Sequence, residues 1–192
     1  MRRAVSLIGW IGAAAAAVVL AVPAGFSAPA ATQTIGVVDF SKRGTLPDIS
    51  GLIPGRYAAD STAALLQRTV RAPVAVLPRK TMMEAEQALG WRDYDITKFA
   101  RLTELAQRAG AAHLVVGTLD RFGYERYAGS LYRSTATVSI QLFTPTPPKI
   151  TKASTGAGTG LASVPANAAQ QALRAAVDEA VKAGRAMLPH GP

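Results

Sequence analysis

The residues most capable of chemistry are two aspartates at the ends of predicted strands. Asp39 closes the apolar run 34–40, and Asp120 lies near the end of the run 111–122. If these strands are parallel neighbours, the two carboxylates converge and could perform acid–base chemistry or bind a divalent metal. The alternative is that each carboxylate caps a loop or pairs with a cation such as Arg121. Because two acids alone do not define such a site, we assign no catalytic and no metal-binding residue.

The remaining chemical motifs are incomplete. The chain has 2 histidines, His113 at the start of a predicted buried strand and His190 near the chain end, so they cannot form a histidine metal cluster. Gly156, Gly158 and Gly160 resemble part of a phosphate loop, but no Lys-Ser/Thr pair follows them. A Gly-x-Ser-x-Gly sequence is absent, which argues against a serine hydrolase. We therefore expect a protein that is not an enzyme and uses no cofactor.

One segment is enriched in the residue types that dominate protein interfaces. Tyrosines and arginines alternate between two predicted strands, which suggests the tip of a hairpin that binds a protein partner. The alternative is an ordinary turn whose tyrosines pack on the flank of the sheet. The long loop 41–56 is a second exposed candidate. The predicted partner-binding residues are Arg121, Tyr124, Arg126, Tyr127, Tyr132 and Arg133.

The N-terminal residues have the pattern of an export signal. Arg2 and Arg3 precede an apolar run over residues 4–22, and the small residues 28–30 provide a cleavage site. We expect residues 1–30 to be a signal peptide and 31–192 to form the exported domain. The alternative is an uncleaved membrane anchor, because the run approaches the length that spans a bilayer.

The amino-acid composition excludes several classes of protein. The 192 residues are 49% hydrophobic and contain no cysteine, which suits one domain and excludes disulfides, thiolate zinc sites and a lipid-modified N-terminal cysteine. Without the leader, 19 basic residues remain against 12 acidic ones. The arginines are scattered rather than bunched, so this charge indicates either a solvated surface or attraction to anionic material. Export argues against nucleic acid as the ligand.

The periodicity predicts one α/β domain of order β-α-β-α-α-β-β-β-α. Apolar runs at 34–40, 72–78 and 111–122 indicate buried strands, strict alternation over 131–143 indicates an antiparallel strand, and 149–160 indicates a weaker edge strand. Apolar residues at helical spacing predict helices at 57–70, 81–89, 97–110 and 166–188. Thr81 and Thr97 are the expected N-caps of the second and third helices, and Asp60 is expected in the first turn of the first.

This arrangement resembles the CsgG-type family. The resemblance rests on the strand ending VVDF, on a helix closing in Gly110 and Ala111, on the strand motif that holds Val115, Val116 and Gly117 with Phe122 after it, and on a Thr/Gly-rich strand before an alanine-rich helix. That family includes the curli assembly and transport component CsgG and is related to the penicillin-binding-protein activator LpoB and to the N-terminal domain of TolB. The resemblance covers residues 34–188 and implies a CsgG/TolB-N-like, anticodon-binding-domain-like fold.

Two departures from that family shape the functional expectation. Family members are often lipoproteins, whereas this chain has no cysteine to lipidate. The connection 123–130 is also too short for the membrane-spanning hairpins of the secretion channel. The resemblance therefore implies a soluble core without a pore and without a membrane span once the leader is removed.

Three function classes follow from these observations. The first is a periplasmic or outer-membrane-associated adaptor or assembly module, whose partner is an envelope protein or a second copy. The second is a basic module that binds anionic envelope or cell-wall material, with binding that falls steeply with salt. The third is a small enzyme that uses Asp39 and Asp120. We favour the first class, a module of protein binding and secretion in the cell envelope.

Overall fold

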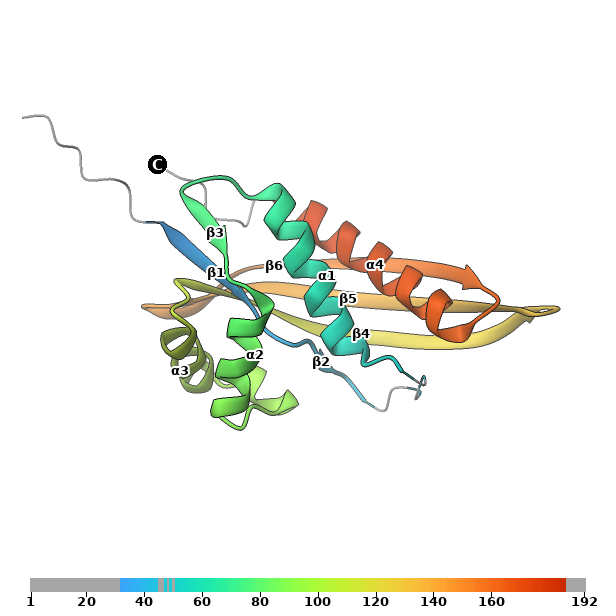
Figure 1. Ribbon diagram of the computed structural model, residues 1–192, viewed down its shortest axis with the longest axis horizontal. Coiled ribbons are helices and arrows are strands. Elements are labelled where there is room, and N and C mark those ends of the chain that lie inside the picture. The colour runs from blue at the N-terminus through green and yellow to red at the C-terminus, as the bar shows by residue number, and fades with distance from the viewer. Residues whose placement is uncertain (1–31, 45–46, 48, 50, 186–192) are drawn as a thin grey trace, which may run out of the picture.

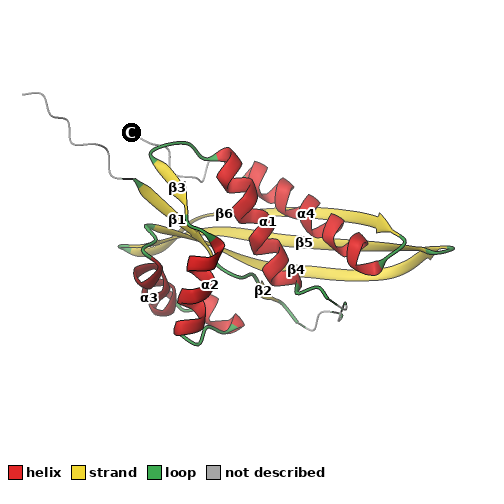
Figure 2. Cartoon of the chain, viewed as in Figure 1, coloured by secondary structure: helices red, strands yellow, loops and turns green. Residues whose placement is uncertain are grey.

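The computed structural model describes residues 32–185 except 45, 46, 48 and 50, and it places a sheet between two pairs of helices (Figure 1, Figure 2). The strands are β1 (Gln33–Val37), β2 (Ser41–Lys42), β3 (Val74–Val76), β4 (His113–Ala128), β5 (Leu131–Pro145) and β6 (Pro148–Ala162). The helices are α1 (Pro54–Thr69), α2 (Arg79–Ala88), α3 (Phe99–Ala109), α4 (Pro165–Ala183) and the short 3-10 helix η1 (Asp93–Thr97).

The sheet combines a parallel half and an antiparallel half. Its strand order is β3-β1-β4-β5-β6, and β2 also pairs with β4. β1 runs parallel to both β3 and β4, whereas β4, β5 and β6 are joined in sequence as antiparallel neighbours. The antiparallel strands are the longest, so β4, β5 and β6 extend as an arm on one side of the molecule (Figure 1).

Alternating side chains of the strands supply two cores, one on each face of the sheet. Val115 and Leu119 of β4 join the core under α1 and α4, whereas Leu114 and Val116 join the core that includes α2 and α3. This follows from the two-residue period of a strand. The residues of β5 that alternate toward the α4 side are all buried, as the sequence predicts: Ser134, Ala136, Val138, Ile140 and Leu142.

The predicted single-domain α/β fold and its order of main elements are confirmed. The structure adds β2 and η1. β4 also extends to Ala128, through most of the segment 123–130 that the sequence predicts as a connection. Only a tight turn at Gly129 and Ser130 separates β4 from β5.

The predicted helix caps are wrong. α2 begins at Arg79, so Thr81 lies inside the helix, and no side-chain hydrogen bond caps its start. α3 begins after Lys98, and the Thr97 hydroxyl instead donates to the carbonyl of Tyr94 in η1. α1 begins at Pro54, which places Asp60 beyond the first turn.

The predicted end of the third helix is confirmed. Gly110 ends α3 with φ of 70°, the left-handed conformation that glycine adopts without steric cost. In α4, Pro165 occupies the first turn, and Asp178 and Lys182 form an ion pair one turn apart.

Three glycines of β6, Gly156, Gly158 and Gly160, form a flat surface against which α4 packs closely. A Cβ on Gly158 would lie 2.5 Å from the backbone nitrogen of Ala176 and closer still to the carbonyl oxygen of Ala172. Gly160 would meet the nitrogen of Ala172 at 2.8 Å. These glycines are therefore a packing surface on a strand, which explains why they lack the remaining parts of a phosphate loop.

Within the described residues, no helix is long and apolar enough to cross a membrane. The predicted signal peptide and His190 lie outside the described residues.

Candidate functional site

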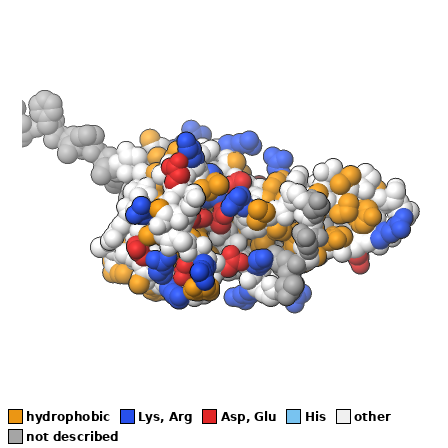
Figure 3. All heavy atoms as spheres, turned by 60° about the horizontal axis from the view of Figure 1, so that its bottom comes forward, with side chains coloured by type: hydrophobic (Ala, Val, Ile, Leu, Met, Phe, Trp, Pro, Cys, Tyr) orange, Lys and Arg blue, Asp and Glu red, His pale blue; other side chains and the backbone are white. Residues whose placement is uncertain are grey.

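The predicted partner-binding residues lie on the distal half of the arm. β4 and β5 pair through Tyr124 and Ser134, Glu125 and Arg133, and Arg126 and Tyr132, beyond the part of β4 that pairs with β1 and β2. At this narrow end of the molecule, hydrophobic side chains lie beside basic and acidic ones (Figure 3). The arm therefore presents one continuous exposed end.

The arm brings these residues together in two small clusters. Tyr124 and Tyr132 meet edge to face, with their ring centroids 6.5 Å apart. Glu125 accepts a hydrogen bond from Arg133 Nε at 2.8 Å, and the Arg133 guanidinium lies 4.8 Å from the ring centroid of Tyr127. Tyr127 is nevertheless 54% exposed. The tyrosines are thus held in place by their neighbours and still present much of their surface to solvent.

The three arginines of the segment have different surroundings. Arg133 pairs with Glu125, and Arg126 Nε donates to the carbonyl of Gly129 in the turn at 3.0 Å. Arg121 is exposed, and no ion pair links it to another described residue. The structure therefore joins five of the six predicted residues near the turn and leaves Arg121 farther down β4.

Asp39 and Asp120 form separate polar clusters. β1, which precedes Asp39, and β4, which contains Asp120, are parallel neighbours, so the condition for convergence is met. Asp120, however, accepts hydrogen bonds from Thr118 and Ser139 and lies 3.4 Å from Arg43, whereas Asp39 pairs with Arg79 and Arg56. No interaction links the two aspartates within the described residues, and Asp120 pairs with Arg43 rather than with Arg121.

The carboxylate that does lie beside Asp39 is Glu86 of α2. Its Oε1 accepts a hydrogen bond from the backbone N–H of Asp39 at 3.2 Å, and the residue is only 7% exposed. Burial, followed by the negative charge of Asp39, raises the pKa of Glu86 to about 7. The one signal in the sequence was its position four residues after the buried Met82, on the apolar face of the predicted helix.

Arg79 holds this cluster together. Its guanidinium binds the carboxylates of Asp39 and Asp60 and the carbonyl oxygen of Val37. The cluster borders an open cavity of about 970 Å³ that Arg56 also lines. Basic and acidic side chains are correspondingly interleaved on this face (Figure 3). Among the described residues, no group of three potential ligands is placed to hold a metal ion.

His113 is a partly buried residue of the sheet whose contacts suit a structural role. Its Nδ1 lies 3.2 Å from the Thr144 hydroxyl, and partial burial lowers the pKa of the imidazole. This histidine links the start of β4 to the end of β5.

Comparisons with known proteins identify the fold. No family model and no curated protein matches the sequence. Lipoprotein GNA1162 from Neisseria meningitidis is similar in structure, with a TM-score of 0.53 and 21% identity over 68% of this chain and 84% of that protein. For a PelC dodecamer from Paraburkholderia phytofirmans, the TM-score is 0.49 and the identity is 16%, over 80% of this chain and 90% of the PelC chain. For the LpoB C-terminal domain from Escherichia coli, the TM-score is 0.43 and the identity is 15%, over 68% of this chain and 84% of that domain. The chain thus shares its α/β fold with a known lipoprotein, and the likeness is one of fold alone.

Proposed function

We propose that this chain is an exported, non-enzymatic adaptor or assembly module of the cell envelope, similar to the soluble core of CsgG-type proteins. Its leader is removed on export, and it binds an envelope protein or a second copy of itself through the end of the β4–β5 arm. The observation that carries the proposal is the exposed cluster of tyrosines and arginines at that end. The fold shared with a lipoprotein supports an envelope role, although this chain has no cysteine for lipid attachment.

The chemistry of the arm suits a protein partner. Tyrosine offers a large contact area at a small cost in side-chain entropy. Tyrosine and arginine are both enriched among the residues that dominate binding energy. The Tyr124–Tyr132 and Arg133–Tyr127 contacts fix these side chains before binding. A surface that is ordered in advance loses less entropy when it binds.

The location of the interface can be tested by photo-crosslinking in intact cells. We expect a photoreactive amino acid at position 127 to give one reproducible protein adduct. The matched control is position 94, because Tyr94 on η1 is 53% exposed and Tyr127 is 54% exposed. Equal adducts from both positions would contradict an interface on the arm. Adducts only with the chain itself would identify the partner as a second copy.

Replacing Arg126 and Tyr127 with alanine should weaken binding of that partner about tenfold or more, since both residues lie at the centre of the proposed interface. The affinity is measured by titrating the captured partner onto the two forms of the chain. The thermal unfolding curve followed by circular dichroism should be unchanged, because both side chains are exposed. An unchanged affinity would contradict the proposal, and a steep loss of binding with salt in both forms would favour the basic module for anionic material.

A further inference from the structure

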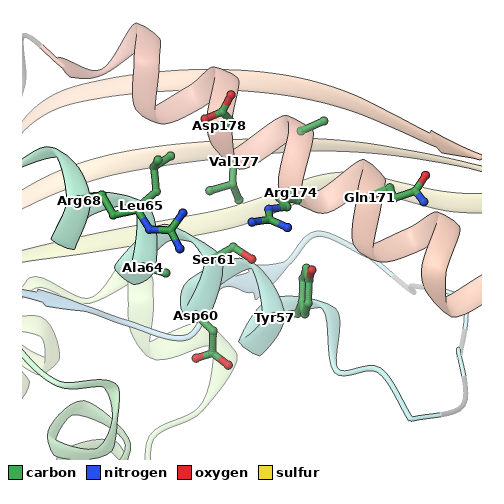
Figure 4. Close-up of a pocket in the computed structure, with 11 residues that line it drawn as sticks. Tyr57, Asp60, Ser61, Ala64, Leu65, Arg68, Gln171, Arg174, Val177 and Asp178 are labelled. Atoms are coloured by element: carbon green, nitrogen blue, oxygen red, sulfur yellow. The ribbon is translucent and has the colours of Figure 1, made fainter.

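A second surface lies in an open groove between α1 and α4. These two helices lie side by side on one face of the sheet (Figure 1). The groove has a volume of about 730 Å³. Leu65 of α1 and Ala175 of α4 supply apolar surface. Tyr57 and Ser61 add hydroxyl groups (Figure 4).

Two arginines, one from each helix, extend into this groove. Arg68 of α1 and Arg174 of α4 point toward one another over Ser61 (Figure 4). Within the part of the chain that the structure describes, neither guanidinium has an ion-pair partner. Two like charges therefore face each other across the same groove.

The acidic residues that line the same groove are engaged elsewhere. Asp60 binds Arg79 Nε at 2.8 Å, and Asp178 pairs with Lys182 on its own helix. Both carboxylates point away from the space between the two arginines (Figure 4). The groove therefore has two unneutralised cations and offers hydroxyl donors beside them.

This set of donors fits a phosphate group. A guanidinium presents parallel N–H groups that bind two oxygens of one oxyanion, and two guanidiniums from different helices can bind different oxygens of a tetrahedral phosphate. The Ser61 hydroxyl can donate to a further oxygen. The apolar side chains of Leu65 and Ala175 can contact the organic part of a phosphate ester.

We infer that the α1–α4 groove binds a phosphate ester, with Arg68 and Arg174 as the groups that hold the phosphate. The ester is either a small soluble compound or the headgroup of a phospholipid. This site is independent of the partner surface on the arm, since it shares no residue with it.

The test is a titration monitored by nuclear magnetic resonance, with the isotope-labelled chain purified in the form in which the cell produces it. The probes are glycerol 3-phosphate and a short-chain phosphatidylglycerol below its micelle concentration. We expect saturable shifts confined to residues 57–68 and 171–178. Similar affinities for the two probes would indicate a soluble ester, and tighter binding of the lipid would indicate a headgroup; both results support the site.

Matched double variants separate a specific site from general charge. Arg68→Ala with Arg174→Ala should weaken phosphate binding about tenfold, because each removes a charge-assisted pair of hydrogen bonds. Arg71→Ala with Arg108→Ala removes the same charge from two exposed arginines outside the groove and should leave binding unchanged. Equal losses in both double variants, or shifts spread over the whole basic surface, would overturn the inference.

Discussion

Replacing Gly158 with alanine should lower the free energy of unfolding by about 3 kcal/mol, the upper end of the usual cost of overpacking a core. The added Cβ would lie 2.5 Å from the backbone nitrogen of Ala176 and nearer still to the carbonyl oxygen of Ala172. Neither atom belongs to a flexible side chain that could turn aside. α4 must therefore move away from β6, and its buried residues lose contacts along the whole helix.

The contact is this close because a strand and a helix with matching repeats face each other. Two residues of a strand advance about 6.6 Å, and four residues of a helix advance about 6 Å. Small residues every second position on β6 therefore meet small residues every fourth position on α4. The glycines are Gly156, Gly158 and Gly160, and they face the backbone around Ala168, Ala172, Ala176 and Ala180.

Gly123→Ala provides the control. Gly123 lies on β4, its backbone is not in the left-handed region, and a Cβ there would meet nothing within 4 Å. Since alanine restricts the unfolded chain more than glycine does, this variant should be neutral or more stable by up to about 1 kcal/mol. Both variants are compared by urea unfolding at equilibrium. If Gly158→Ala were as stable as Gly123→Ala, the close packing of α4 on β6 would be contradicted.

Local periodicity was sufficient to predict the main helices and strands of this fold, but not β2 or η1. The alternation over 131–143 and the glycine that ends α3 depend on residues within a few positions of one another, and both predictions are confirmed. The order of strands and helices follows from the same short patterns. These features are predictable because the physics behind them acts between neighbours in the chain.

Helix starts were less predictable. Thr81 and Thr97 have the right residue type for an N-cap, but the helices begin at positions where no side chain caps them. A side-chain hydrogen bond at a helix start occurs instead at η1, where the N–H of Arg92 donates to the Asp95 side chain at 3.1 Å. Capping stabilises a helix by only about 1 kcal/mol, so packing of the helix on the sheet can move its first residue.

The partners of charged residues depend on contacts between distant segments. Asp120 does not pair with the adjacent Arg121. The register of β4 shifts between Leu119 and Arg121, and at this irregularity Asp120 accepts hydrogen bonds from Thr118 and Ser139. Its cation is Arg43, which follows β2. Asp39 likewise meets Glu86 and Arg79 of α2, more than a helix away in the chain. No short motif encodes such a pairing, so the sequence alone directed attention to the wrong pair of acids.

Glu86→Gln should make the chain more stable than the wild type at pH 8, and this difference should fall to about 1 kcal/mol or less at pH 5. Glu86 has a pKa of about 7 in the folded chain and an ordinary value of 4.5. Between these values the folded protein holds a proton that the unfolded chain releases. The stability contributed by the neutral carboxyl is therefore complete below pH 4.5 and is lost as the pH rises through 7.

The size of the effect follows from the same two values. Their difference corresponds to about 3 kcal/mol at pH 8, where the buried carboxylate is ionised beside Asp39. Arg79 and Arg56 lower the pKa but do not offset burial and the neighbouring charge. Glutamine is never charged, and its side-chain oxygen can still accept the N–H of Asp39. The substitution thus removes the titration and keeps the hydrogen bond.

Glu84→Gln is the matched control, because Glu84 lies on the same helix with its side chain 64% exposed and pairs only loosely with Lys80 at 3.8 Å. Urea unfolding of the three proteins from pH 5 to 8 should give parallel curves for the wild type and Glu84→Gln and a diverging one for Glu86→Gln. His113 titrates in all three and cancels in the comparison. Parallel curves for all three proteins would contradict the prediction, because they would mean that Glu86 stays ionised from pH 5 to 8. A charged Glu86 near Arg79, rather than a neutral carboxyl, would then link α2 to the end of β1.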